Sequence, residues 1–198
     1  MTPAGSHIYS TINTLIHATP SGSNKNQLHN SIINNIFADQ LIFNYMSNTF
    51  SQIYIQVVFA VKGRECQIQH SWENQLYKYI TGIVQNHNQK MIAINGMPDH
   101  IHFLIGMKPT CCLSDLVREI KKCSNTYIKE NRLTKSKFQW QDGFGAFSYS
   151  HSSLDNVVQY VMNQKEHHVK KTFKQEYEEF LTRFNIEFKS EYVFEWYE

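Results

Sequence analysis

The 198-residue chain is long enough for one compact domain with an appendage, and its 41% hydrophobic content is enough for a core. The formal net charge of +2 identifies no class of partner by itself. The four cysteines show no CxxC spacing, which argues against a disulfide framework. No apolar run approaches the ~20 residues of a membrane span, so we expect a soluble, cytoplasmic protein.

The first 45 residues differ from the rest of the chain. They are rich in Asn and Ser, and Lys25 and Asp39 are their only acidic or basic side chains. A regular pattern begins directly after Met46. We expect residues 1–45 to be a poorly ordered extension, or to precede a native start at Met46, and to carry no chemistry. The domain would then span residues 46–184, and residues 185–198 would form an acidic, aromatic tail.

Hydrophobic periodicity and turn signals predict the elements in chain order. We expect a strand at 50–62, a helix at 71–89, strands at 90–96 and 100–106 joined by a tight turn, a helix at 113–132 with Ser114 as candidate N-cap, a strand at 138–150 bent at Gly143 or Gly145, a helix at 152–168, and a further helix at 174–184. The order β-α-β-β-α-β followed by a helix fits an α+β fold, a ferredoxin-like sandwich with an antiparallel sheet.

Two histidines, His100 and His102, lie one residue apart in an apolar strand. Side chains at positions i and i+2 share one face of a strand, roughly 6–7 Å apart, which is close enough for two imidazoles to bind one cation. From the spacing alone, a metal site and two half-exposed histidines without a functional role are equally good interpretations. A zinc hydrolase of the HxHxDH kind does not fit, because Phe103 and Leu104 follow His102.

A nucleophile and a third ligand are available on the helix predicted at 152–168. Tyr160 and Gln164 are four residues apart and therefore share one face of that helix. Gln164 offers an amide oxygen to a hard cation, and Tyr160 offers a phenol. A phenol with an ordinary pKa of ~10 needs a Lewis acid on its electrophile. In isolation, an ordinary surface tyrosine remains the simpler interpretation.

Three segments together carry a resemblance to a known family. "MPDHIHFLI", "FQWQDGFGAFSYS" and "VVQYVMNQKEHH" resemble, in order and spacing, the single-tyrosine HUH transposases of the smallest hairpin-ended insertion sequences, the 200/605 group. The HUH motif (His, hydrophobic residue, His) is His100, Ile101 and His102 here. The similarity extends from about Thr49 to Phe184 and excludes residues 1–45.

The resemblance implies a specific chemistry. His100, His102 and Gln164 would hold Mg²⁺ or Mn²⁺, and Tyr160 would attack a DNA phosphodiester to give a 5′-phosphotyrosine and a free 3′-hydroxyl. Such proteins act as dimers on single-stranded DNA with hairpins at the element ends, in bacterial or archaeal cells, and the tyrosine helix of one subunit often completes the site of the other. The roles of His167 and His168 stay open, between help with the tyrosine proton and a plain surface position.

Positive charge is concentrated on the helix predicted at 113–132 and just beyond it, and a second basic run begins at Lys165. The candidate DNA contacts are Arg118, Lys121, Lys122, Lys129, Arg132 and Lys165. A solvated helix face is the alternative. Two other functions remain: a replication or relaxase nickase, which often has a second tyrosine or a third clustered histidine, neither evident here, and a non-catalytic nucleic-acid-binding module.

Overall fold

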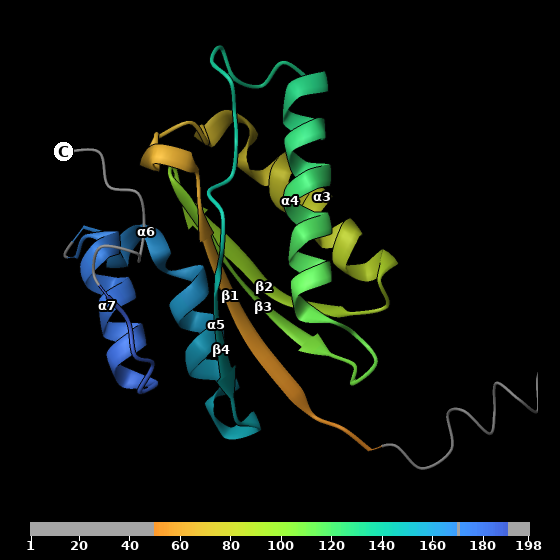
Figure 1. Ribbon diagram of the computed structural model, residues 1–198, viewed down its shortest axis with the longest axis vertical. Coiled ribbons are helices and arrows are strands. Elements are labelled where there is room, and N and C mark those ends of the chain that lie inside the picture. Colours follow the sequence, from red (N-terminus) through yellow and green to blue (C-terminus); the bar gives the residue numbers. More distant parts are fainter. Residues whose placement is uncertain (1–49, 170, 190–198) are drawn as a thin grey trace, which may run out of the picture. The chain divides into compact units, whose positions relative to one another are not determined.

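A four-stranded antiparallel sheet of order β2-β3-β1-β4 forms the centre of the domain (Figure 1). The computed structural model describes residues 50–169 and 171–189. The strands are β1 (Ile53–Ala60), β2 (Lys90–Met97), β3 (His100–Met107) and β4 (Gly145–Tyr149). Helices α3 (His70–Asn86) and α4 (Leu113–Glu130) make the two crossovers. This order and pairing confirm the predicted ferredoxin-like sandwich.

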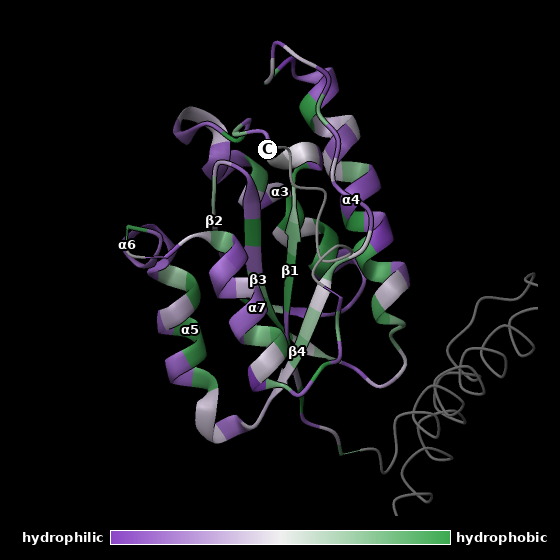
Figure 2. Cartoon of the chain, turned by 60° about the vertical axis from the view of Figure 1, so that its left-hand side comes forward, coloured by the Kyte–Doolittle hydropathy of each residue, from purple (hydrophilic) through white to green (hydrophobic). Residues whose placement is uncertain are grey.

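Both crossover helices cover one face of the sheet, where the larger core forms (Figure 1). Alternate residues of the central strands point to this face, and in Figure 2 β1 is coloured mainly as hydrophobic. Buried side chains from both layers meet there, among them Phe59, Phe103, Leu76, Ile80, Leu116 and Ile120. The odd-numbered positions of β3 are thus used by the core, and its even-numbered positions face the opposite side.

The opposite face is covered by α5 (Leu154–Met162), α6 (Gln164–His167) and α7 (Phe173–Arg183). Two smaller apolar clusters hold this layer, one around Phe147 and Phe180, the other around Leu104 and Val161. The predicted helix at 174–184 is confirmed as α7. Its start is fixed by a capping box between Thr172 and Gln175.

The helix predicted without interruption at 152–168 is wrong in one respect: it breaks at Asn163 into α5 and α6. The Asn95 side chain of β2 donates to the Met162 carbonyl at 2.6 Å. The amide of Glu166, which would normally bond that carbonyl, donates to the Asn163 carbonyl instead. A tertiary hydrogen bond therefore replaces a helical one at the break.

Two local predictions also need correction. The strand expected at 138–150 is regular only in β4, with a single bridge between Val61 and Trp140 before it. The predicted bend lies at Gly143, which adopts a φ of +74°. The predicted N-cap Ser114 is wrong, because α4 begins at Leu113 and has Cys112 as its N-cap, without a side-chain cap.

The expectations for residues 1–45 and for most of the tail at 185–198 fall outside the described ranges. A short 3-10 turn, η1 (Lys62–Arg64), follows β1, and another, η2 (His151–Ser153), precedes α5. Among residues 50–169 and 171–189, no helix combines the length and the apolar character needed to cross a bilayer.

Candidate metal and nucleophile site

The two histidines of the HUH motif lie side by side on β3 and face the α5–α7 layer. Their ring centroids are 5.1 Å apart, and both side chains are essentially inaccessible to solvent. Ile101 between them packs into the core on the other side of the sheet. The strand alternation predicted from the sequence therefore places both imidazoles on one face, as expected.

Each imidazole is oriented by a partner on its Nδ1 atom. His100 Nδ1 lies 2.6 Å from Oδ1 of Asp99. His102 Nδ1 lies 3.1 Å from the amide of Gln56, whose Oε1 accepts a hydrogen bond from the Tyr149 hydroxyl at 2.9 Å. A histidine held through one ring nitrogen presents the other in a fixed direction, which is how metal-binding histidines are usually supported.

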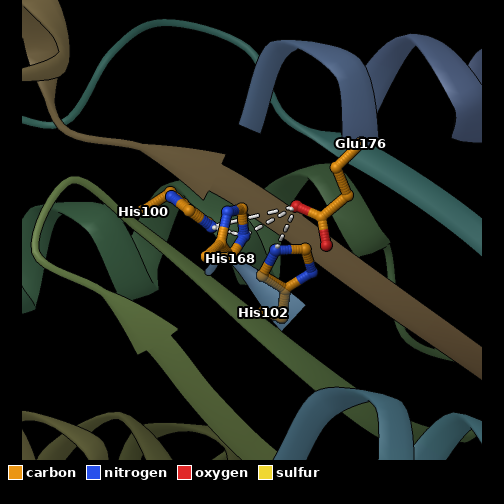
Figure 3. A group of neighbouring side chains, drawn as sticks. All are labelled: His100, His102, His168 and Glu176. Atoms are coloured by element: carbon orange, nitrogen blue, oxygen red, sulfur yellow. Dashed lines mark hydrogen bonds and ion pairs between the residues drawn. The ribbon is translucent and has the colours of Figure 1, made fainter. Parts of the chain in front are cut away.

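Two residues that the sequence did not single out as ligands complete the cluster. His168, which follows α6, and Glu176, in the first turn of α7, converge on the same point as the HUH pair (Figure 3). Glu176 Oε2 lies 3.4 Å from His102 Nε2, 3.1 Å from His168 Nε2 and 4.0 Å from His100 Nε2. The expectation that no third histidine is clustered here is therefore wrong.

Tyr160 and Gln164 reach this cluster through Glu176. The Tyr160 hydroxyl donates to Glu176 Oε1, and the Tyr160 ring lies 6.2 Å from the His102 ring, centroid to centroid. Gln164 is fully buried, and its Nε2 lies 3.3 Å from Glu176 Oε1. His167 stacks edge-on against Tyr160 at 5.1 Å. The structure thus brings together every residue that the sequence predicted for the catalytic and metal site.

Burial controls the charge of the histidines. It lowers the pKa of His100 to about 3 despite the opposing Asp99 carboxylate, and it lowers the pKa of His168 to about 4. Both imidazoles are therefore neutral near pH 7, which is the state that binds metal ions.

The donor set fits a divalent cation. His102 Nε2, Glu176 Oε2 and Gln164 Oε1 are buried and lack a hydrogen-bond partner within the described part of the chain. Buried polar atoms are normally satisfied, and two of these atoms, His102 Nε2 and Glu176 Oε2, lie where the four side chains meet, which fits a bound cation. A hollow of about 520 Å³, lined by His100, His168 and Phe173 among others, opens beside the cluster.

The candidate DNA contacts fall into two groups. Lys121 and Lys165 are engaged inside the protein: Lys121 Nζ donates to the carbonyls of Gln141, at 2.7 Å, and Gly143, and Lys165 Nζ lies 2.5 Å from Glu73. Four others are exposed, two of them with a local acidic neighbour on α4. They are Arg118 beside Asp115, Lys122 beside Glu119, Lys129 and Arg132.

The basic helix lies across the sheet from the cluster, but the two are linked at one end of the sheet. A hollow of about 360 Å³ lies between α4 and residues 139–144. The backbone N–H of Gln141 donates to the backbone carbonyl of Ala60, and Ala60 pairs with His100 across β1 and β3. The hollow and the histidines are therefore neighbours on opposite faces of the sheet.

The fold and the site together define a ferredoxin-like domain with an HUH pair and a tyrosine beside it. The family model "Transposase IS200 like" matches residues 49–164. This is more than half of the chain, and the protein therefore belongs to the IS200-like transposases.

Solved structures give more distant similarities. A proposed transposase of Deinococcus radiodurans R1 shares 19% identity over 59% of this chain and 94% of that one, with a TM-score of 0.46. A REP-associated tyrosine transposase bound to a REP hairpin shares 18% identity over 63% of this chain and 74% of that one, with a TM-score of 0.47. No curated protein matches the chain.

Proposed function

We propose that this transposase cuts and rejoins single-stranded DNA at hairpin-marked element ends through a 5′-phosphotyrosine intermediate. The observation that carries the proposal is the meeting of Tyr160 with both HUH histidines around one buried carboxylate, in a chain of this family. A non-catalytic nucleic-acid-binding module gives no reason for this convergence.

His100, His102 and Gln164 are the residues that would hold Mg²⁺ or Mn²⁺. When bound, the ion supplies Lewis acidity to an oxygen of the scissile phosphate and stabilises its negative charge. Asp99 orients the His100 imidazole and Gln56 orients the His102 imidazole, each through a contact with the Nδ1 atom of the ring. The buried Gln164 oxygen, which has no hydrogen-bond partner within the described residues, is the third donor.

Tyr160 would form the covalent bond. Its phenolic oxygen bonds to phosphorus, the P–O3′ bond breaks, and the 3′ oxygen takes a proton and leaves as a hydroxyl. His167, whose ring lies 5.1 Å from the Tyr160 ring, would accept the proton that Tyr160 gives up once Glu176 has moved away. Attack by a 3′-hydroxyl on the phosphotyrosine reverses these steps and rejoins DNA without an external energy source.

The exposed basic residues of α4 would bind the DNA backbone. Their side of the sheet meets the histidine side at the edge formed by residues 139–144. A hairpin bound along α4 can therefore send its single-stranded flank over this edge towards Tyr160. Lys165 is better placed to hold α6 against α3, since Glu73 occupies its ammonium.

The test is a covalent adduct. Protein, Mg²⁺ and a labelled single strand carrying a hairpin are incubated and separated on a denaturing gel. We expect an adduct from the unmodified chain and none from Tyr160→Phe; an undiminished adduct in Tyr160→Phe would remove this residue as the nucleophile. His100→Ala should abolish cleavage while hairpin binding remains, whereas a hairpin that binds and is never cut would favour the binding module.

The partner arrangement is tested by mixing variants. We propose a homodimer in which Tyr160 acts within its own subunit, because it lies beside His102 of the same chain. A mixture of Tyr160→Phe and His102→Ala subunits should then form no adduct. An adduct from the mixture would instead place the tyrosine of one subunit in the site of the other.

A further inference from the structure

Four side chains approach one another closely enough to share a single ion. The Nε2 atoms of His100 and His168 are 3.1 Å apart, and Glu176 Oε2 is 3.1 Å from His168 and 3.4 Å from His102. All four donor atoms, including His100 Nε2, lie within 4.8 Å of one another. In a tetrahedral zinc site with bonds of about 2.0–2.1 Å, neighbouring ligand atoms are about 3.3–3.5 Å apart.

The supports behind these donors are already in place. His168 Nδ1 lies 3.1 Å from the Lys171 carbonyl, just as His100 Nδ1 lies against Asp99 and His102 Nδ1 against Gln56. All three histidines therefore present Nε2 to the centre. Glu176 comes from a different element, and the capping box at the start of α7 fixes its position.

The chemistry of this donor set differs from that of the predicted catalytic site. Three imidazoles and one carboxylate suit Zn²⁺ and similar transition metals, whereas Mg²⁺ prefers oxygen ligands and keeps several waters. Four protein ligands also fill a tetrahedral ion, and a closed site of this kind has no position for a substrate. A catalytic site keeps such a position open.

We propose that His100, His102, His168 and Glu176 form a closed, four-ligand site for Zn²⁺ or a similar transition metal. Gln164 is not a ligand in this state, and Glu176 occupies the place of a substrate oxygen. The filled site ties α7 to β3 through buried ligands.

The closed site has a consequence for the nucleophile, and this part rests on the proposed function. The Oε2 atom of Glu176 faces the histidines, and its Oε1 atom accepts a hydrogen bond from the Tyr160 hydroxyl. An ion bound to Oε2 therefore holds the same carboxylate that restrains the phenol. Zn²⁺ bound in this way keeps Tyr160 away from DNA and excludes Mg²⁺ from the HUH pair.

The binding test uses the full chain, stripped of metal, without DNA. Zn²⁺ affinity is measured by competition with a coloured chelator, and Co²⁺ is added as a spectroscopic substitute. We expect one ion per chain and the intense visible absorption of four-coordinate Co²⁺. Weak absorption typical of six-coordinate Co²⁺, or no binding, overturns the proposal.

Two matched pairs of variants identify the ligands. Glu176→Gln should weaken Zn²⁺ binding at least about tenfold, and Glu178→Gln on the same helix should leave it unchanged. His168→Gln should weaken it similarly, in contrast to the same change at the exposed His151, His151→Gln. His168→Gln exchanges one neutral side chain for another and leaves no unpaired buried charge, so it keeps the test decisive if Glu176→Gln does not fold. Unmodified affinity in His168→Gln or in folded Glu176→Gln overturns the ligand set.

The consequence for Tyr160 is tested separately. Zn²⁺ equal to the protein concentration is added to the Mg²⁺-dependent adduct reaction, and the yield is expressed relative to the same variant without Zn²⁺. We expect strong suppression in the unmodified chain and little in His168→Gln. Equal suppression in both overturns the restraint on Tyr160. If no adduct forms under any condition, the proposed function fails while the DNA-free binding results still decide the metal site.

Discussion

Replacing Gln56 tests most directly whether the hydrogen bond to His102 Nδ1 holds the imidazole in the orientation that binds a metal ion. Gln56 is fully buried on β1, between the Tyr149 hydroxyl and His102 Nδ1. When His102 Nε2 binds a cation, the neutral ring carries its proton on Nδ1, so the Gln56 carbonyl oxygen must face it. A half-turn of the amide achieves this and lets the amide nitrogen donate to Tyr149 instead.

The size of the effect follows from the two hydrogen bonds. Gln56→Leu keeps a similar volume but leaves His102 Nδ1 and the half-buried Tyr149 hydroxyl without this partner. Each buried group left unsatisfied costs about 1–3 kcal/mol, with the half-buried Tyr149 hydroxyl at about 1 kcal/mol, so we expect a loss of about 2–4 kcal/mol in the free energy of unfolding. A domain with about 5–15 kcal/mol remains folded. Loss of the support should lower metal affinity about 10–100-fold.

Two measurements decide the matter, urea unfolding of the metal-free protein and metal affinity by chelator competition. Gln56→Glu is the matched control, because a carboxylate accepts from both His102 and Tyr149 and should preserve metal affinity. Tyr149→Phe removes only the outer hydrogen bond and should cost stability with a smaller effect on the metal. If folded Gln56→Leu binds metal as tightly as the unmodified chain, the supporting role is refuted.

Two further predictions concern the backbone around the site. Lys121→Met should lower the free energy of unfolding by about 1–3 kcal/mol, because two carbonyls lose their donor; Lys122→Ala should change it by less than about 0.5 kcal/mol and weaken DNA binding at low salt. Equal stability of the two variants in urea would contradict this. Gly96→Ala should lower both the melting temperature and metal affinity, because its Cβ would lie 2.4 Å from the His100 carbonyl oxygen. Gly82→Ala, whose new Cβ would meet no atom beyond its own stretch of helix within 4 Å, should instead be neutral or stabilising in the same melting experiment.

The sequence was sufficient for the parts of the site that depend on local periodicity. A strand alternates its side chains, so the separation of His100 and His102 by one residue placed them on one face. The spacing of Tyr160 and Gln164 survived the break at Asn163, since Gln164 Nε2 still lies 3.4 Å from the Tyr160 carbonyl oxygen. The ferredoxin-like order followed from the alternation of strand and helix patterns in the same way.

Glu176, which the sequence did not single out, shows where local reasoning ended. It lies among other acidic residues, Glu178 and Glu179, where a solvent-exposed carboxylate is the ordinary expectation. Its helical phase contained a usable signal: it is three residues after Phe173 and four before Phe180, both buried. A carboxylate within the apolar stripe of a helix must be paired when it is buried. Which side chains pair with it depends on how α7 packs on β3, and no local pattern specifies that contact.

His168 was missed for a related reason. The same reason explains how the residues after α5 come to lie beside the histidines of β3. Every residue from 154 to 168 is compatible with a continuous helix, and a straight helix would carry His168 onward in the direction of α5. The hydrogen bond from Asn95 to the Met162 carbonyl ends α5 instead, and the chain after Asn163 turns so that His168 reaches His100. Asn95 is also the register partner of His102 across the β2–β3 hairpin. Strand β2, which pairs with the strand of the HUH histidines, therefore also sets the break that brings the third histidine to them, a coupling between elements far apart in sequence.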